Sequence, residues 1–456
     1  MDTEILARIQ FAFTVAFHYL YPPLSIGLGV ILVMMEGMYI KTKKPLYEQM
    51  TKFWVKVFAL TFAMGVATGI VMEFEFGTNW ATYSRFVGDV FGSALAAEGI
   101  FAFFLESGFL ALLVFGWDKV KPRTHLLATI MVSLGSMFSA IWIVVANSWQ
   151  QTPAGFHLVG EGLNVRAEIT DFWAMVFSPS SMDRLSHVLS GAWLAGSFLV
   201  ISVSAYYILK NRHLDFAKSS LKIALLLALF ASLFQLYTGD RSAVGVSKNQ
   251  PAKLAAMEGQ FDSSAVGDIH LFGWVDKKDK EVKLSVSIPG LLSYLVYGDA
   301  SKPIIGLDAF PEGETPPVNI VFQAYHLMVA IGFFLIGITL LGIFLWWRKK
   351  LFNHRWLLWV FVFSVLGPQI ANQVGWITAE VGRQPWIVYG LLKTSDAFSK
   401  VVTSGQIMFS LILFAIIYLF LFILFIYLLN EKIKHGPDEP ETIGSEYETH
   451  KHIFEK

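Results

Sequence analysis

Nine apolar segments, each long enough to cross a lipid bilayer, are the feature that most constrains the fold of this chain. A transmembrane helix needs about 20 predominantly apolar residues, because the hydrocarbon core of a bilayer is ~30 Å thick. The segments cover approximately residues 9–39, 53–74, 91–117, 126–146, 182–209, 219–237, 318–347, 356–378 and 404–429. The sequence therefore predicts an all-α polytopic membrane protein. Its composition, 55% hydrophobic and 15% charged residues, is typical of that class.

The Lys and Arg residues of the connecting loops predict the orientation of these spans. The loops after the first, third, fifth and seventh spans are short and basic, and the flank after the ninth span, NEKIKH, is basic as well. Basic loops generally stay in the cytoplasm. We therefore expect the N-terminus outside and the C-terminus in the cytoplasm, as an odd number of spans requires. The start of the chain, MDTEILARIQ, lacks the features of a cleaved signal peptide.

One connection is much longer than the others and separates two groups of spans. We expect transmembrane helices 1–6 over residues 1–237, an outer loop over 238–317, helices 7–9 over 318–435 and a cytoplasmic tail over 436–456. Within the loop, DKKDKEVKLSVSIPG alternates as a short strand pair does, and PGLLSYLVY is apolar. Short helices and a hairpin over the outer surface are therefore expected, followed by a polar, acidic tail.

Two features of the composition exclude whole classes of site and partner. The chain contains no cysteine, which excludes disulfides, thiolate metal sites, iron–sulfur clusters and covalently attached c-type haem. Its 35 Lys and Arg residues balance its 35 Asp and Glu residues, so no nucleic-acid partner is expected.

The third predicted span contains two carboxylates, Glu98 and Glu106, within the apolar stretch GSALAAEGIFAFFLESGFLALLV. An ionisable group at membrane depth costs roughly 2.5–3.5 kcal/mol on insertion scales, so it is usually retained for a function. The alternative is that each carboxyl group only forms a hydrogen bond with a neighbouring helix. Because the two residues lie about two helical turns apart, on nearly one face, we interpret them as a ligand or proton site inside the membrane.

Potential iron ligands from five predicted spans fall in the outer half of the membrane. At 1.5 Å per residue, four of them lie roughly 8–15 Å below the outer ends of their spans, and a fifth lies at the end of its own span. They are His18, Glu98, His187 and Met328, and the fifth is Glu380. Haem iron takes axial His, and a His/Met pair forms a six-coordinate centre for electron transfer. The alternatives are packing histidines and a Met that fills the core.

Copper or zinc would require more imidazoles close together. The chain has no adjacent His pair, which speaks against a haem–copper oxidase. Glu106 lies deeper than Glu98, towards the predicted inner surface. Together with Ser107 beside it and Ser139 on the fourth span, Glu106 could pass protons from the inside to a redox site. A buried carboxyl group paired with a neighbouring hydroxyl is the alternative.

Four motifs make the chain similar to a known family. MEFEFGTNW (72–80), AAEGIFAFFLES (96–107), KLAAMEG (253–259) and GWITAEVGRQPW (375–386) all resemble subunit I of cytochrome bd quinol oxidase. The similarity covers nearly the whole chain, and a membrane Glu followed by GRQPW is its most specific part. The resemblance implies three cofactors, which are two haem b groups, one low-spin and one high-spin, and one haem d.

The resemblance also implies ligands for these haems. His187 and Met328 match the axial pair of the low-spin haem b. The ligands of the high-spin haem b and haem d match His18, Glu98 and Glu380, in an assignment that differs between members of the family.

Other residues of the family match by position as well. The matches are Glu106, Ser107 and Ser139 for a proton path, Trp376 for an aromatic residue between the haems, Arg383 for a haem propionate, and Lys253 and Glu258 for quinol oxidation. Without the resemblance, Lys253 and Glu258 would be interpreted as solvated surface charges.

Two departures from the family pattern limit what the resemblance implies. His326 lies two residues before Met328, where some members have Arg, so a titratable imidazole replaces a permanent charge. The outer loop lacks the long C-terminal insertion of the enterobacterial members, so the chain resembles the short-loop type.

The sequence thus predicts the haem-containing subunit of a terminal respiratory oxidase in the bacterial cytoplasmic (inner) membrane. The oxidase would oxidise quinol at the outer face and reduce O2 to water with cytoplasmic protons, which generates a membrane potential without pumping. Expected partners are a second large membrane subunit and a small single-span subunit, within the lipid bilayer. The sequence does not distinguish menaquinol from ubiquinol, or haem d from haem b at the oxygen site.

Two other classes of protein could use ionisable residues in the membrane. A proton-coupled secondary transporter would use Glu98 and Glu106, and it should have inverted repeats and broken helices at the midplane. The sequence contains no clear repeat. A non-catalytic haem anchor would need only the low-spin pair and would leave His18 and Glu380 without a role.

Overall fold

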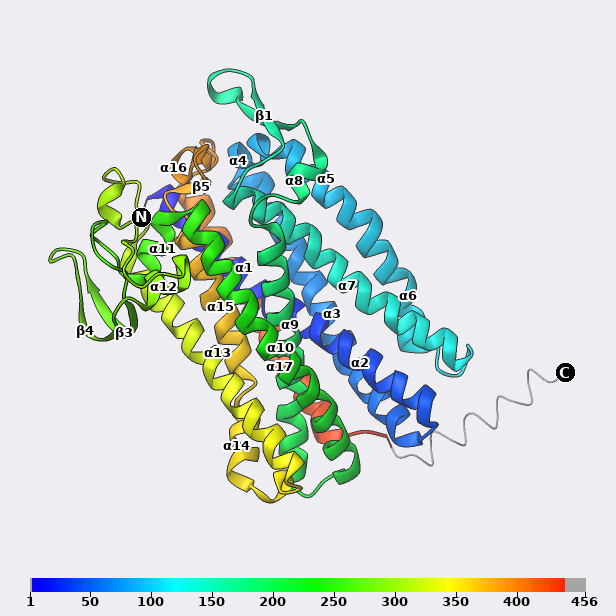
Figure 1. The fold of residues 1–456 in the computed structure, drawn as a ribbon. Coiled ribbons are helices and arrows are strands. Elements are labelled where there is room, and N and C mark those ends of the chain that lie inside the picture. Colours follow the sequence, from blue (N-terminus) through cyan, green and yellow to red (C-terminus); the bar gives the residue numbers. More distant parts are fainter. Residues whose placement is uncertain (1, 439–456) are drawn as a thin grey trace.

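The computed structural model describes residues 2–438 and shows a bundle of long helices (Figure 1). Within these residues, nine helical segments are long and apolar enough to cross a membrane, which confirms the predicted number. They are Thr3–Thr42, Pro45–Thr78, Gly88–Phe115, Pro122–Gln151, Ser181–Leu209, Leu214–Asn249, Val318–Trp347, Arg355–Val381 and Ser404–His435. The predicted tail lies outside the described residues from residue 439 onwards.

Two of the segments are interrupted where the sequence interpretation treated them as continuous spans. The first consists of α1 (Thr3–His18) and α2 (Pro22–Thr42), and the eighth consists of α14 (Arg355–Phe363) and α15 (Leu366–Val381). Proline lacks the backbone N–H that a helix interior needs and is tolerated in the first turn. Pro22 and Pro23 open α2, and Pro368 lies in the first turn of α15, so both breaks coincide with prolines. As a result, His18 lies at the end of a helix rather than inside one.

The third segment changes its helical type next to Glu98. A π-helical stretch, η1 (Gly99–Phe103), separates α5 (Gly88–Glu98) from α6 (Phe104–Phe115). A π-helix has i→i+5 hydrogen bonds, so it rotates the residues that follow relative to an unbroken α-helix. The orientation of Glu106 relative to Glu98 therefore depends on this stretch.

Helix α9 (Ser181–Leu209) lies at the centre of the bundle and is the most buried of the nine segments. It packs against α2, α7 (Pro122–Gln151), α10 (Leu214–Asn249) and α14. Glycines allow the closest of these contacts, because a Cβ atom on Gly27 would lie 2.7 Å from the backbone nitrogen of Gly196. Small residues at helix contacts are typical of membrane bundles.

The remaining long helices surround this centre. They are α3 (Pro45–Thr78), α13 (Val318–Trp347) and α17 (Ser404–His435). Most apolar side chains of α17 are exposed, as expected for a helix that faces lipid or another subunit.

One end of the bundle, called the loop end here, carries the N-terminus and almost all of the short elements (Figure 1). The connection between α10 and α13 forms α11 (Pro251–Glu258), β3 (Ile269–Asp276), β4 (Glu281–Ile288), α12 (Leu291–Tyr297) and η3 (Leu307–Ala309). Strands β3 and β4 pair antiparallel, so the loop contains a hairpin as predicted, but DKKDKEVKLSVSIPG supplies only its turn and its second strand, and the first strand precedes that stretch. Helix α12 confirms a short helix in PGLLSYLVY. Helix α10 runs on to Asn249, so it extends well beyond the predicted end of the sixth span at residue 237.

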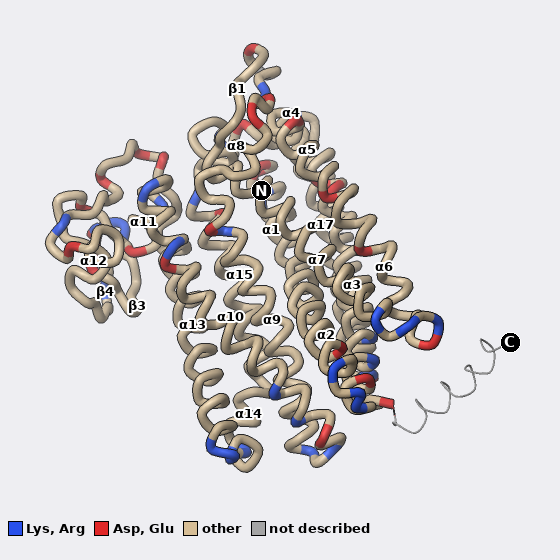
Figure 2. The backbone as a smooth tube through the Cα atoms, turned by 45° about the vertical axis from the view of Figure 1, so that its right-hand side comes forward, with Lys and Arg blue, Asp and Glu red and all other residues tan. Residues whose placement is uncertain are grey.

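Smaller elements complete the loop end. They are α4 (Ala81–Phe86), β1 (Phe156–Val159), η2 (Gly162–Asn164), β2 (Arg166–Ile169), α8 (Phe172–Val176), β5 (Trp386–Val388), β6 (Leu392–Lys393) and α16 (Thr394–Ala397). The opposite end, called the basic end, contains η4 (Leu351–Asn353) and short connections rich in Lys and Arg, coloured blue in Figure 2.

Candidate cofactor site

His18, the last residue of α1, is held by a threonine of α3. Its Nδ1 lies 2.9 Å from Oγ1 of Thr68, and that hydroxyl donates to the carbonyl oxygen of Met64. The threonine oxygen therefore accepts from His18 Nδ1–H, which assigns the tautomer and leaves Nε2 as an unprotonated base. The next residue, Gly69, leaves room for the ring, because a Cβ atom there would lie 3.2 Å from Cε1 of His18.

His187 on α9 has the same arrangement with α10. Its Nδ1 lies 3.0 Å from Oγ1 of Thr238, whose hydroxyl donates to the carbonyl oxygen of Gln235. Its Nε2 lies 2.9 Å from the side-chain amide nitrogen of Gln235. Gly239 follows the threonine, and a Cβ atom there would lie 3.5 Å from Cε1 of His187.

Both histidines thus meet a Thr-Gly pair on the neighbouring helix. Histidines that bind a metal usually donate their second N–H to an oxygen, which fixes the ring and increases the basicity of the free nitrogen. His18 and His187 satisfy this condition before any metal is bound. The sequence interpretation missed Thr68 and Thr238, although two TG pairs in apolar spans, ATGIV and YTGDR, are visible in the sequence.

Met328 on α13 faces α15. A Cβ atom on Gly375 would lie 3.1 Å from the sulfur of Met328, so this glycine leaves room for the thioether. Helix α9 reaches the same part of α15, because a Cβ atom on Gly191 would lie 2.8 Å from Oδ1 of Asn372. Gly191 is about one turn from His187, and Asn372 is about one turn from Gly375. His187 and Met328 therefore approach α15 from two sides.

The carboxyl groups of Glu98 and Glu106 both meet serines of α7. Ser139 Oγ donates to Glu98 at 2.5 Å, and Ser136 Oγ donates to Glu106. Ser139, which the sequence analysis grouped with Glu106 in a proton path, therefore bonds to Glu98, and Ser136, which it did not identify, bonds to Glu106. Ser107 is exposed, and its hydroxyl donates to the carbonyl oxygen of Phe103 in its own helix rather than to Glu106.

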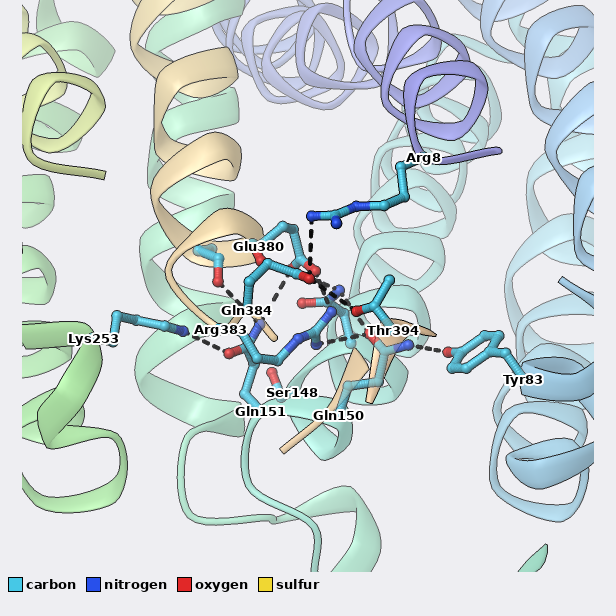
Figure 3. A network of polar contacts seen from close by, with 12 residues as sticks. Arg8, Tyr83, Ser148, Gln150, Gln151, Lys253, Glu380, Arg383, Gln384 and Thr394 are labelled. Carbon is cyan, nitrogen blue, oxygen red and sulfur yellow. Dashed lines mark hydrogen bonds and ion pairs between the residues drawn. The ribbon is translucent and has the colours of Figure 1, made fainter. Parts of the chain in front are cut away.

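Glu380 lies at the centre of a polar network at the loop end (Figure 3). Arg383 Nη2 donates to Glu380 Oε2 at 2.5 Å, and the side-chain amides of Asn147 and Gln151 donate to Oε1 at 3.1 and 3.2 Å. Arg383 Nη1 also donates to Gln150 Oε1 at 3.1 Å. The network connects the EVGRQPW motif of α15 with the end of α7.

Two further basic side chains border this network and leave an excess of positive charge. Lys253 on α11 is 5% exposed and donates to Gln151 Oε1 at 2.6 Å. Burial lowers the pKa of Lys253 well below its ordinary value, and the charges of Arg184 and Arg383 lower it further. Arg184 on α9 donates to Asn147 Oδ1 at 2.5 Å and lies 5.9 Å from the ring centre of Trp376. Two guanidinium groups, with the Lys253 amine beside them, thus surround one carboxylate.

Glu258, at the end of α11, is 2% exposed, and its Oε2 has no hydrogen-bond partner among the described residues. Burial raises its pKa to about 8, and a hydrogen bond with Tyr325 of α13 opposes that rise. The alternative in which Lys253 and Glu258 are solvated charges is therefore wrong, because the packing of α11 against α13 buries both. Tyr325 was missed by the sequence interpretation.

Two other buried carboxylates were also missed. Glu36 of α2 lies 2.7 Å from His125 Nδ1 and accepts from Thr129 at 2.5 Å, near the basic end. Glu75 of α3 accepts from Thr14 at 2.8 Å, near the loop end. Glu36 within its apolar span, and the pair Glu73 and Glu75 in the apolar stretch VMEFEFG, are the signals that could have identified them.

Comparisons with known proteins agree on one family. The family model described as "Cytochrome bd terminal oxidase subunit I" matches residues 6–437. The chain is 40% identical to cytochrome bd ubiquinol oxidase subunit 1 of Bacillus subtilis, over 96% of this chain and 95% of that protein. It is 34% identical to cytochrome bd-II ubiquinol oxidase subunit 1 of Escherichia coli, over 96% and 97%.

A solved structure is similar over the same length. It is the bd oxidase from Geobacillus thermodenitrificans, with a TM-score of 0.88 and 29% identity. The similarity covers 96% of this chain and 99% of that chain.

Proposed function

The chain belongs to the cytochrome bd terminal oxidase subunit I family, and from this premise we propose how its residues serve the oxidation of quinol and the reduction of O2 to water. Membership makes the protein a quinol oxidase of a bacterial respiratory chain, with haem as the expected cofactor. Interrupted helices are present here, and a secondary transporter would also have them. Membership in the family nevertheless identifies the chain as an oxidase subunit rather than as a transporter.

The proposed orientation has the loop end outside and the basic end in the cytoplasm of the inner membrane. Its support is the concentration of Lys and Arg in the connections of the basic end (Figure 2). The Lys253 and Glu258 side chains would then lie near the outer surface, whereas the inner ends of α6 and α7 would face the cytoplasm.

The residues of this chain fit haem. His18 and His187 each have an unprotonated Nε2 and a fixed Nδ1–H, and the Nε2 of His187 accepts from the side-chain amide of Gln235, which would have to move for His187 to bind iron. His187 and Met328 would hold a low-spin haem b. His18, Glu98 and Glu380 would bind a high-spin haem b and a haem d. When bound, these haems supply electron transfer and the site of O2 reduction.

The excess charge of the network supports the same proposal. Arg184, Arg383 and Lys253 surround Glu380 alone, and Arg383 Nε has no hydrogen-bond partner among residues 2–438. Buried charges are costly unless they are paired. Haem carries two propionates, so anionic groups at this position would balance the remaining cations. Trp376, beside Arg184, would lie between haems.

Quinol oxidation is proposed at α11. A quinol hydroxyl must lose a proton as it is oxidised, and a base with a pKa near the working pH is best suited to accept it. Glu258 has a pKa of about 8 and an unpartnered oxygen, so its carboxylate can accept that proton and release it at the loop end. Lys253 would position the quinol oxygen opposite.

Protons for water formation would come from the basic end. Glu106 and Glu98 are each connected to α7 through one hydroxyl, and Ser136 and Ser139 are one helical turn apart on the same face. The proposed relay therefore runs from Glu106 through these serines to Glu98, and Ser107 lies beside it. Taking protons from one side and releasing them on the other conserves roughly 2.3 kcal/mol per charge at 100 mV, without a pump.

The oxidase would contain further subunits. The relatives are named subunit 1, which implies a second large subunit, and we propose that a small single-span subunit joins them in the membrane.

The fixed, unprotonated histidines are the observation that carries the haem proposal. Reduced-minus-oxidised absorption spectra of the purified complex test it. His187→Ala should remove the low-spin haem b signal and keep a chlorin band from haem d, whereas His354→Ala, at the basic end, should leave all signals unchanged. A low-spin signal that survives His187→Ala would show that the axial assignment is wrong, and a spectrum with only b-type bands would exclude haem d.

A further inference from the structure

The β3–β4 hairpin carries apolar side chains on its exposed surface. Phe272 and Trp274 are 57% and 58% exposed, and Leu271, Val286 and Ile288 are exposed as well. The charged residues of the hairpin all fall between Asp276 and Lys283, around its turn. One end of the hairpin is therefore apolar and the other is charged.

Hydrogen bonds with α13 determine which end lies deeper. Asn319 Oδ1 accepts from the backbone nitrogen of Val275 at 3.3 Å, and Gln323 Nε2 donates to the carbonyl oxygen of Gly273 at 2.6 Å. One turn further along the helix, His326 Nε2 lies 2.6 Å from the carbonyl oxygen of His270. Strand β3 thus runs antiparallel along the first turns of α13, with its charged turn furthest from the bundle (Figure 1).

The position of the membrane boundary follows from the length of α13. This helix ends at Trp347, beside the basic sequence RKK. About 20 residues span the hydrocarbon core, so counting outward from Trp347 reaches the other boundary at about residue 328. His326, and with it the apolar end of the hairpin, therefore lies at that boundary. On this count the first turns of α13 project beyond the hydrocarbon core, so Met328 lies less deep than a span beginning at residue 318 would place it.

Helix α13 also carries exposed apolar residues just beyond its contact with this end of the hairpin. Leu327, Phe333 and Phe334 are exposed apolar residues on the part of α13 that spans the core. Aromatic residues are enriched where a membrane protein crosses the interface, since their apolar rings are buried among lipids at the level of the headgroups. Phe272 pairs with Val286 towards the apolar end of the hairpin, whereas Trp274 pairs with Lys283, next to the charged turn.

We propose that the apolar end of the β3–β4 hairpin inserts into the interfacial region of the bilayer leaflet at the loop end. The loop between α10 and α13 is then held to the membrane by lipid contacts as well as by α13. Separation of charge is the reason to prefer lipid to a protein partner, because the charged turn points to water and the apolar end points to the boundary. This inference concerns the depth of the hairpin and does not depend on the proposed chemistry of Glu258.

Cysteine labelling of the complex in lipid nanodiscs tests the depth directly, because this chain has no cysteine of its own. The variants are Phe272→Cys at the apolar end and Lys278→Cys in the turn, each labelled with a bimane fluorophore. Lipids brominated in their acyl chains should quench the Phe272→Cys label several-fold more than the Lys278→Cys label. Iodide in the buffer should quench the two labels in the opposite order.

Two results would overturn the proposal. Equal quenching of both labels by iodide would place the whole hairpin in water. Protection of the Phe272→Cys label from both quenchers would show that another subunit or a second copy covers it. Val286→Cys provides a second test if Phe272→Cys disturbs folding, because Val286 pairs with Phe272 across the hairpin. Labelled complex without an introduced cysteine gives the background from other subunits.

Discussion

Replacing Tyr325 with Phe should shift the pH dependence of quinol oxidation to higher pH. Burial raises the pKa of Glu258 to about 8, and the hydrogen bond with Tyr325 opposes that rise. At pH 7, roughly a tenth of the Glu258 carboxyl groups are then ionised and able to accept a proton. Because a hydrogen bond to the ionised form lowers a carboxyl pKa, its removal must raise the pKa of Glu258 further.

The size of this shift follows from the strength of the hydrogen bond. A hydrogen bond to a charged group contributes about 1.5–3 kcal/mol, and ~1.4 kcal/mol corresponds to a tenfold change in an equilibrium constant. In the Tyr325→Phe variant, the rising limb of the rate profile should therefore move up by at least about one pH unit. The quinol-limited rate at pH 7 should fall by about tenfold, and it should recover at higher pH.

The assay is kcat/KM for quinol, measured on the purified complex between about pH 6 and 9.5. Tyr297→Phe is the matched control, because Tyr297 is an exposed tyrosine of the same loop and its replacement should leave the profile unchanged. Glu258→Gln should abolish the rising limb. A limb that stays in place in Tyr325→Phe, or moves to lower pH, would refute the idea that this hydroxyl stabilises the ionised carboxylate.

Three further predictions concern other contacts. Thr238→Val removes the acceptor of His187 Nδ1–H, so the reduction potential or the occupancy of the low-spin haem should change in a spectroscopic titration; an unaltered titration would contradict the tautomer assignment. Ser136→Ala should slow proton uptake, measured with a pH indicator during turnover, several-fold more than Ser107→Ala, and the reverse order would exclude the proposed relay. Glu258 binds its proton in the folded state up to a pH of about 8 but would release it near its ordinary pKa of 4.5 when unfolded, so stability present below pH 4.5 is lost as the pH rises through 8. Thermal unfolding of Glu258→Gln should therefore depend less on pH over that window than unfolding of the wild type.

The number of spans could be predicted because burial in lipid makes hydropathy a direct signal of structure. The interruptions could have been predicted in part, since Pro22, Pro23 and Pro368 lie within apolar runs. The π-helical turn after Glu98 could not, because no residue type specifies it. The sequence analysis also ended the sixth span too early, at residue 237, although α10 continues to Asn249. Its last turns are polar, and helix formation there depends on contacts at the loop end rather than on apolar composition.

The sequence allows an expected depth for each proposed ligand, whereas it does not predict the partners of each side chain. Helical rise converts sequence position into depth, but the rotation of each helix about its axis depends on packing. For this reason Glu98 and Ser139 were both identified, but the hydrogen bond between them was not. Lys253 and Glu258 were identified by motif, and their burial became evident only from the packing of α11 against α13.

The network around Glu380 links the proposed role of Glu380 as an iron ligand with the proposed role of Arg383 as the partner of a haem propionate. Both carboxylate oxygens of Glu380 are occupied in the protein chain, one by Arg383 and the other by the amides of Asn147 and Gln151. Oε2 accepts from Arg383 alone, so it keeps a lone pair for iron, whereas Oε1 already accepts two hydrogen bonds. Arg383 also reaches Gln150, and its Nε has no hydrogen-bond partner among the described residues. An anionic group that accepted the Arg383 hydrogen bonds would release Oε2 of Glu380. Charge balance then favours that exchange, since Arg184 remains to neutralise the carboxylate.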